Sequence, residues 1–263
     1  MCLQVVFVIK LLSFFSFVLA TPCLGMGSSS SDSVQTDSVK SQRILLKRHL
    51  SAAVPGLMLG VGALALENPG LRSVNRFVRK AVLETKPNLK HHFEDNLRHL
   101  PTASAFFMQA VGIEGKHNFI GKATVYALAT TIANQSVDRL KSVSRVLRPD
   151  GSDRRSFPSG HTTTAFVAAE FLRQEYKDVS PWIGIAGYTT AAATGALRIY
   201  HNKHWLTDVV AGAGVGILST NLAYFVYSRS PIPRSKRLQR YNFRVLPVYS
   251  QKSLGIGLHY KPD

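Results

Sequence analysis

The chain has 263 residues, of which 45 % are hydrophobic and only 18 % charged, so it is too apolar for a disordered or fibrous protein. Its 32 basic residues outnumber 15 acidic ones, and the resulting charge of +17 predicts an anionic partner: nucleic acid, an anionic membrane surface or a phosphorylated substrate. Two cysteines, Cys2 and Cys23, are too few for a disulfide framework, and no Cys and His spacing matches a zinc site.

Residues 1–20 predict an export signal. Lys10 precedes an apolar run, and Val18 and Ala20 stand at the −3 and −1 positions of a cleavage site. An uncleaved first membrane helix is the alternative. A lipoprotein anchored through Cys23 is disfavoured because Pro22 precedes that cysteine. Export of the chain from the cytoplasm follows if the signal is cleaved.

Residues 21–40 are rich in serine and predict a flexible linker, so the fold is expected to begin near Ser41. Beyond it, apolar runs predict a bundle of six helices, of which the last two approach the roughly 20 residues needed to cross a bilayer. The runs are Ala52–Leu66, Ala103–Ile113, Ala123–Ala133, Thr162–Leu172, Trp182–Ile199 and Val209–Tyr227. Their many Gly and Ala residues favour close contact between membrane helices, so we expect a largely membrane-embedded fold.

A basic segment from Arg72 to Arg98 lies between the first two runs. Its first half has the pattern of an interfacial amphipathic helix, and a solvated helix on the face of the bundle is the alternative. Three histidines lie near its end, but they lack the carboxylate pattern of a metal site, so we expect no metal there: His91, His92 and His99.

The tail of the chain, residues 229–263, changes character. A basic cluster precedes two alternating stretches, Phe243–Tyr249 and Ser253–Tyr260, which predict a small β-hairpin. The cluster suits a cytoplasmic end by the positive-inside rule. The equally basic segment Arg72–Arg98 and a cleaved signal point the other way, so the sequence assigns no membrane orientation.

Three clusters of polar residues between Lys141 and Asp208 suggest chemistry. Lys141 and Arg148 are seven residues apart, so we expect both cations on one face of a helix that Pro149 ends. In Pro158-Ser159-Gly160-His161, Ser159 can cap a following helix, and Gly160 allows close approach of an anion to the helix start. An ordinary capped helix start is the structural alternative.

The third cluster holds a histidine and an acid. His204 and Asp208 are four residues apart, so the carboxylate is expected to accept the imidazole N–H and leave the other nitrogen free, as a nucleophilic histidine requires. Arg198 supplies a bidentate donor suited to phosphate. His201 competes as the nucleophile, but no acid follows it at the same spacing.

Together the three clusters, with their spacing, resemble the type 2 phosphatidic acid phosphatase (PAP2) superfamily over about residues 100–227. One departure is Leu197, where the family usually has a serine. The resemblance implies an all-α bundle of six helices over residues 41–228 and a phosphatase that needs no metal or cofactor. It also implies that His204 attacks phosphorus to form a phosphohistidine, Asp208 orients His204, and His161 protonates the leaving oxygen and later activates water. The phosphate-binding groups would be Lys141, Arg148, Ser159, Gly160 and Arg198.

The resemblance is strongest to short exported bacterial lipid phosphatases. It implies a phosphorylated membrane lipid as substrate, with lipid A favoured, and a site on the periplasmic face of the inner membrane. Isoprenyl diphosphate, phosphatidylglycerol phosphate and soluble phosphomonoesters are the alternative substrates, and a vanadium haloperoxidase is disfavoured by the short chain. A noncatalytic binder of anionic lipid or nucleic acid is the alternative class. Nucleic acid is disfavoured because neither a pattern of aromatic residues interleaved with the basic ones nor a groove-reading motif is evident.

Overall fold

The structure is a computed structural model that describes residues 52–85, 93–230, 242–250 and 253–261. The predicted signal and linker lie outside these residues. Each of the six apolar runs forms a helix: Ala52–Leu64, α5 (Leu100–Ala110), α6 (Phe119–Ser144), α7 (Gly160–Tyr176), α8 (Pro181–Tyr200) and α9 (Leu206–Arg229). Two more helices, α3 (Pro69–Glu84) and the single-turn α4 (Glu94–Leu97), lie within the basic segment. Apart from the tail, the described residues therefore form an all-helical domain.

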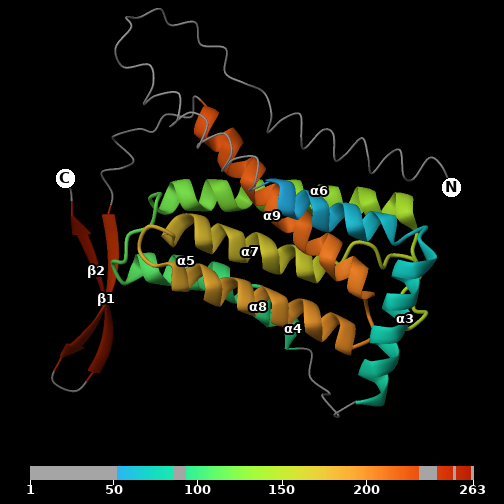
Figure 1. Cartoon of the computed structure of the whole chain (residues 1–263). Coiled ribbons are helices and arrows are strands. Elements are labelled where there is room, and N and C mark those ends of the chain that lie inside the picture. The colour runs from blue at the N-terminus through green and yellow to red at the C-terminus, as the bar shows by residue number, and fades with distance from the viewer. Residues whose placement is uncertain (1–51, 86–92, 231–241, 251–252, 262–263) are drawn as a thin grey trace, which may run out of the picture.

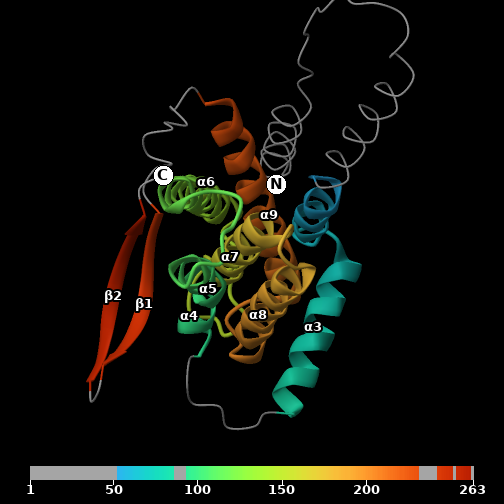
Figure 2. The same ribbon diagram turned by 90° about the vertical axis from the view of Figure 1, so that its left-hand side faces the viewer.

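Helix α3 forms where the sequence has helix-capping residues but no apolar run. Asn68 caps its first turn by accepting hydrogen bonds from the N–H groups of Gly70 and Leu71, and Pro69 occupies the first helical position. The helix crosses one end of the bundle, roughly perpendicular to the other long helices (Figures 1 and 2). It exposes Val74 and Phe77 beside basic residues, so its amphipathic character was predicted correctly.

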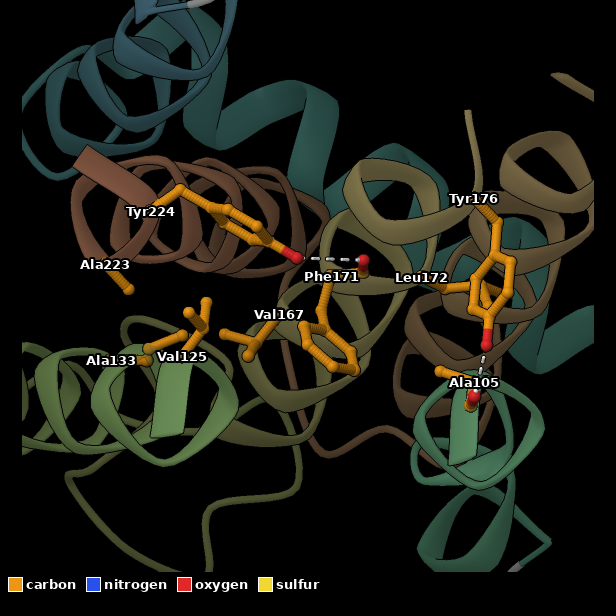
Figure 3. Close-up of a cluster of buried hydrophobic side chains, with 10 residues drawn as sticks. Ala105, Val125, Ala133, Val167, Phe171, Leu172, Tyr176, Ala223 and Tyr224 are labelled. Carbon is orange, nitrogen blue, oxygen red and sulfur yellow. Dashed lines mark hydrogen bonds between the residues drawn. The ribbon is translucent and has the colours of Figure 1, made fainter. Parts of the chain in front are cut away.

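The core forms where α7 and α9 pack against each other and against α5, α6 and α8 (Figure 3). Glycines make the contact between α7 and α9 close. A Cβ atom on Gly212 would lie 2.7 Å from the backbone oxygen of Ser159, and one on Gly216 would lie 2.6 Å from that of Thr163. The predicted small-residue packing is therefore confirmed, and it fixes the start of α7 against the first turns of α9.

Among the described helices, α9 is the one that is long and apolar enough to cross a membrane by length and composition. Of its most apolar 18-residue window, 67 % is buried within the protein. We also expected the preceding helix, α8, to approach the length and apolar character of a membrane span, and this expectation is not confirmed.

The tail contains two antiparallel strands, β1 (Asn242–Ser250) and β2 (Ser253–Lys261), in which Ser250 pairs with Ser253. They form a hairpin at the positions where the sequence alternates, at the end of the bundle away from α3 (Figure 1).

Candidate active site

Four helix ends meet at the end of the bundle that α3 crosses, and they bring the three polar clusters together. The C-terminal ends of α6 and α8 contribute Lys141 and Arg198, and α7 begins with Gly160 and His161. His204 lies in the short loop that joins α8 to α9. Helix ends carry unsatisfied backbone groups and partial charges, so this arrangement suits the binding of a small charged group.

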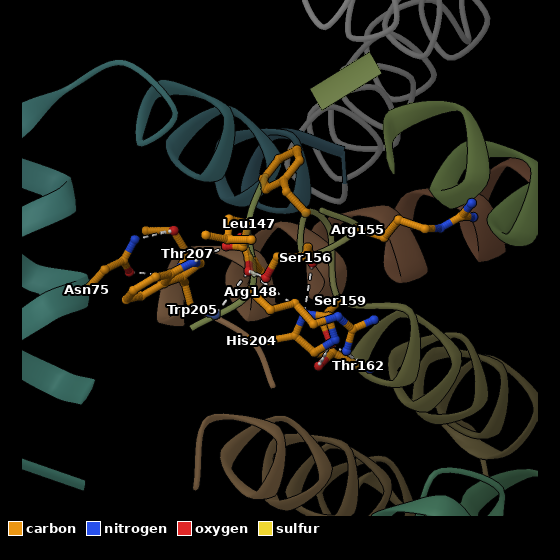
Figure 4. A network of polar contacts seen from close by, with 12 residues as sticks. Asn75, Leu147, Arg148, Arg155, Ser156, Ser159, Thr162, His204, Trp205 and Thr207 are labelled. Atoms are coloured by element: carbon orange, nitrogen blue, oxygen red, sulfur yellow. Dashed lines mark hydrogen bonds and ion pairs between the residues drawn. The ribbon is translucent and has the colours of Figure 1, made fainter. Parts of the chain in front are cut away.

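Arg148 does not lie on the same helix as Lys141, and that prediction was wrong. Helix α6 ends at Ser144 because Arg145 adopts a left-handed conformation with φ of 46°. Arg148 lies in the loop beyond it, where its Nε donates to Asp153 Oδ1 at 2.8 Å. The loop still brings the Arg148 side chain beside His204 (Figure 4). Burial and the nearby charges of Arg148 and Arg155 lower the pKa of Lys141.

Ser159 caps α7 as the sequence predicted. Its Oγ accepts hydrogen bonds from the N–H of Thr162 at 3.5 Å and from Thr162 Oγ1 at 2.9 Å. The first amides of α7, those of Gly160 and His161, begin the helix beside Lys141, since a Cβ atom on Gly160 would lie 3.6 Å from Lys141 Nζ. A helix start and an ammonium group therefore border the same space, and both favour an anion.

The predicted hydrogen bond between His204 and Asp208 is not made. His204 precedes α9, whose N-cap is Trp205, so it does not share a helical turn with Asp208. Its Nδ1 donates to the backbone oxygen of Ser156 at 2.8 Å and lies 3.8 Å from Asp208 Oδ2. Asp208 instead accepts from Ser156 Oγ at 2.5 Å and from the N–H of Trp205 at 3.0 Å. Asp208 therefore acts on His204 both directly, as a charge 3.8 Å from Nδ1, and through its contact with Ser156.

The hydrogen-bond pattern assigns the tautomer of His204. A backbone carbonyl can only accept, so Nδ1 carries the proton and Nε2 keeps its lone pair. Burial lowers the pKa of His204, while Asp208 raises it and the charges of Arg198 and Arg148 lower it. The imidazole is therefore neutral near pH 7, in the form that can attack an electrophile.

Arg198 is held by Glu94, a residue that the sequence analysis did not single out. Arg198 Nη1 donates to Glu94 Oε1 at 3.0 Å, and His201 Nδ1 lies 2.8 Å from the same oxygen. Glu94 is fully buried. No acid follows His201 at the spacing of His204 and Asp208, yet His201 has an acidic partner from α4, which lies far away in the sequence.

His161 also meets an acid from α4, since its Nε2 lies 2.7 Å from Asp95 Oδ1. Burial and the charge of Arg198 lower the pKa of His161 to about 4, although Asp95 opposes the shift. The same contact with His161 lowers the pKa of Asp95. Without a bound anion, His161 is therefore neutral at pH 7.

Sequence reasoning missed Glu94, Asp95 and Ser156. The one signal for the first two was their place as adjacent acids in a segment otherwise dominated by basic residues. Ser156 had no signal at all, because its role rests on a backbone oxygen that the folded loop turns toward His204.

The completed geometry defines a class of site: cations and a helix start around the position of a small anion, next to a neutral imidazole with a free nitrogen. In keeping with it, residues 135–231 match the model of the PAP2 superfamily. This segment of the chain is therefore similar to the PAP2 superfamily.

One curated relative is a phosphatase by name. The chain is 42 % identical over 134 residues to the lipid A 1-phosphatase of Porphyromonas gingivalis, a match that covers 50 % of this chain and 30 % of that protein. The chain thus spans less than a third of the length of this curated relative.

Two solved structures are similar. The transmembrane PAP2 type phosphatidylglycerolphosphate phosphatase of Bacillus subtilis is 23 % identical, with a TM-score of 0.52 over 70 % of this chain and 99 % of that one. LpxE of Aquifex aeolicus is 22 % identical, with a TM-score of 0.47 over 58 % and 95 % of the two chains. The first shows a shared fold.

Proposed function

We propose that this chain is a phosphatase that removes a phosphate group from a membrane lipid, with lipid A as the favoured substrate. The observation that carries the proposal is the neutral His204, whose Nδ1 is hydrogen-bonded and whose Nε2 is free, beside Arg148 and Arg198. The name of the relative from Porphyromonas gingivalis supports lipid A among membrane lipids.

In the proposed reaction, Nε2 of His204 attacks phosphorus as the bond to the leaving oxygen breaks, and His161 gives that oxygen a proton. Water then attacks the phosphohistidine, His161 takes the proton of the water, and the N–P bond breaks to release phosphate and neutral His204. Lys141, Arg148 and Arg198, with the Ser159 hydroxyl and the Gly160 amide, would neutralise the phosphoryl oxygens, which is the main contribution of a protein to phosphoryl transfer.

The proposed location is the bacterial inner membrane, with the site on the periplasmic side. The proposed division of the chain has a signal at residues 1–20, a linker at 21–40, the catalytic domain at 41–228 and a basic tail with its hairpin at 229–263. The candidate span α9 and the exposed apolar residues of α3, at the end of the bundle that holds the site, support a lipid substrate.

The test is phosphate release by the full chain in detergent with a chelator present. We expect release from lipid A, little from a short soluble phosphomonoester, and none from lipid A with His204→Ala. His99→Ala is the matched control, since it removes an exposed histidine that the proposed reaction does not use. Activity retained by His204→Ala would show that His204 is not the nucleophile. Phosphate release from an isoprenyl diphosphate or phosphatidylglycerol phosphate alone would show that this lipid, and not lipid A, is the substrate.

A further inference from the structure

Asn75 is the buried residue of α3, a helix that otherwise lies open on the end of the bundle. The Asn75 residue is 8 % exposed, whereas its neighbours Arg76 and Phe77 are exposed. An amide buried in a surface helix must find hydrogen-bond partners, because an unsatisfied one would cost about 1–3 kcal/mol. The side chain points away from solvent, toward the first turn of α9 (Figure 4).

The partner of Asn75 is Thr207, which contacts both ends of the amide. Asn75 Nδ2 donates to Thr207 Oγ1 at 2.8 Å, and the N–H of Thr207 donates to Asn75 Oδ1 at 3.2 Å. The first N–H groups of a helix have no partner inside it, and a cap residue usually satisfies them. Trp205, the N-cap of α9, has an indole that only donates. Asn75 therefore caps α9 from another helix.

A second contact from α3 reaches the other side of His204. Arg79 Nε donates to Asn202 Oδ1 at 3.0 Å, and its guanidinium lies 5.8 Å from the centre of the Trp205 ring. Asn202 has φ of 58°, a backbone conformation that needs support from its surroundings. Helix α3 thus holds the chain both before and after His204, at Asn202 and at Thr207.

We propose that Asn75 is a positioning residue for the nucleophile. It fixes Thr207, the residue before Asp208, and so fixes the position of the first turn of α9. From this turn, Asp208 reaches Ser156. Ser156 in turn holds Nδ1 of His204. Asn75 would thus act on His204 through this chain of contacts and would not touch the phosphate. The inference rests on the proposed function, because it assigns Asn75 to the nucleophile of that reaction.

Steady-state kinetics on a phosphorylated substrate that the wild type hydrolyses test the proposal. Asn75→Ala should lower kcat by roughly ten- to a hundredfold and leave KM within about twofold, since misplacement of a reacting group costs rate more than binding. Asn75→Asp should restore most of kcat, because a carboxylate can accept from both the N–H and the hydroxyl of Thr207. Ser73→Ala, the matched control, removes a hydroxyl on α3 that bonds only within its own helix at 2.6 Å and should leave kcat unchanged.

Two further measurements keep the proposal open to refutation. Thr207→Val removes only the hydroxyl contact, so it should lower kcat by no more than Asn75→Ala does, and the double variant should be no slower than Asn75→Ala alone. An unchanged kcat in Asn75→Ala, or losses that multiply in the double variant, would overturn the proposal.

The third measurement needs no turnover, so it separates this inference from the proposed function. The Nδ1 proton of His204 should give a protected downfield NMR signal that exchanges faster with solvent in Asn75→Ala than in Ser73→Ala. If the wild type hydrolysed no phosphate ester, the proposed function would fail while this signal still reported the position of His204. Equal exchange in the two variants would refute the positioning role.

Discussion

Binding of a divalent anion to the site should be coupled to protonation of His161. Burial and the charge of Arg198 hold the pKa of His161 at about 4, below its ordinary value of 6.5. An anion between His161 and Arg198 cancels that charge and favours the imidazolium, so it raises the pKa. The proton that the leaving oxygen receives would thus be acquired as the phosphate binds.

The magnitude follows from linkage. Sulfate is a suitable probe because it stays divalent across the range and cannot be hydrolysed. If bound sulfate returns the pKa of His161 to near 6.5, its affinity should rise about thirtyfold from pH 7.5 to pH 5. The affinity for sulfate rises at low pH because the complex binds more protons than the free protein. Affinity is therefore gained as the pH falls through the pKa of His161 in the complex.

Isothermal titration calorimetry of the full chain in detergent, in two buffers of different ionisation enthalpy, counts the protons taken up. His161→Gln should abolish most of the pH dependence. His204 also faces the anion, so His204→Gln is the matched control and should keep most of the pH dependence. Sulfate affinity that does not change with pH, or the same slope in His161→Gln as in the wild type, would refute the reasoning.

Three further predictions concern residues around the site. Glu94→Gln leaves the buried Arg198 without its carboxylate partner and should lower the free energy of unfolding by about 3 kcal/mol, which thermal unfolding in detergent would report. Gly212→Ala brings a Cβ to 2.7 Å from the Ser159 oxygen and should lower the free energy of unfolding by about 1–3 kcal/mol. Gly60→Ala is the control, because a Cβ there meets nothing within 4 Å. Equal melting temperatures of the two variants would count against the α7–α9 contact. Asp208→Asn should lower kcat by roughly a hundredfold and Ser156→Ala by less, because the backbone oxygen of Ser156 remains; a larger loss in Ser156→Ala would contradict this order.

Local sequence signals were enough to predict the start of α7 and the close packing of helices through small residues. Ser159 is a cap residue next to a helix-forming run, and Gly212 and Gly216 are four residues apart and so share one face of α9. Both features depend on residues a few positions apart, so pattern alone reveals them.

Contacts between distant segments could not be predicted in this way. Glu94 lies 104 positions from Arg198, and Asp95 lies 66 positions from His161, so no periodicity links the members of either pair. The expected bond from His204 to Asp208 failed for a related reason. Spacing by four residues brings side chains together only within a helix, and α9 begins after His204.

The position of α3 and α4 in the chain bears on where the functional unit begins. The segment that matches the family, residues 135–231, contains every residue of the three motifs. Asn75, Glu94 and Asp95 all precede that segment, yet they contact Thr207, Arg198 and His161. A fragment trimmed to the matched segment would keep the whole motif and lose the groups that hold it in place. The smallest piece of this chain that could be fused to another protein as a working module therefore begins before α3.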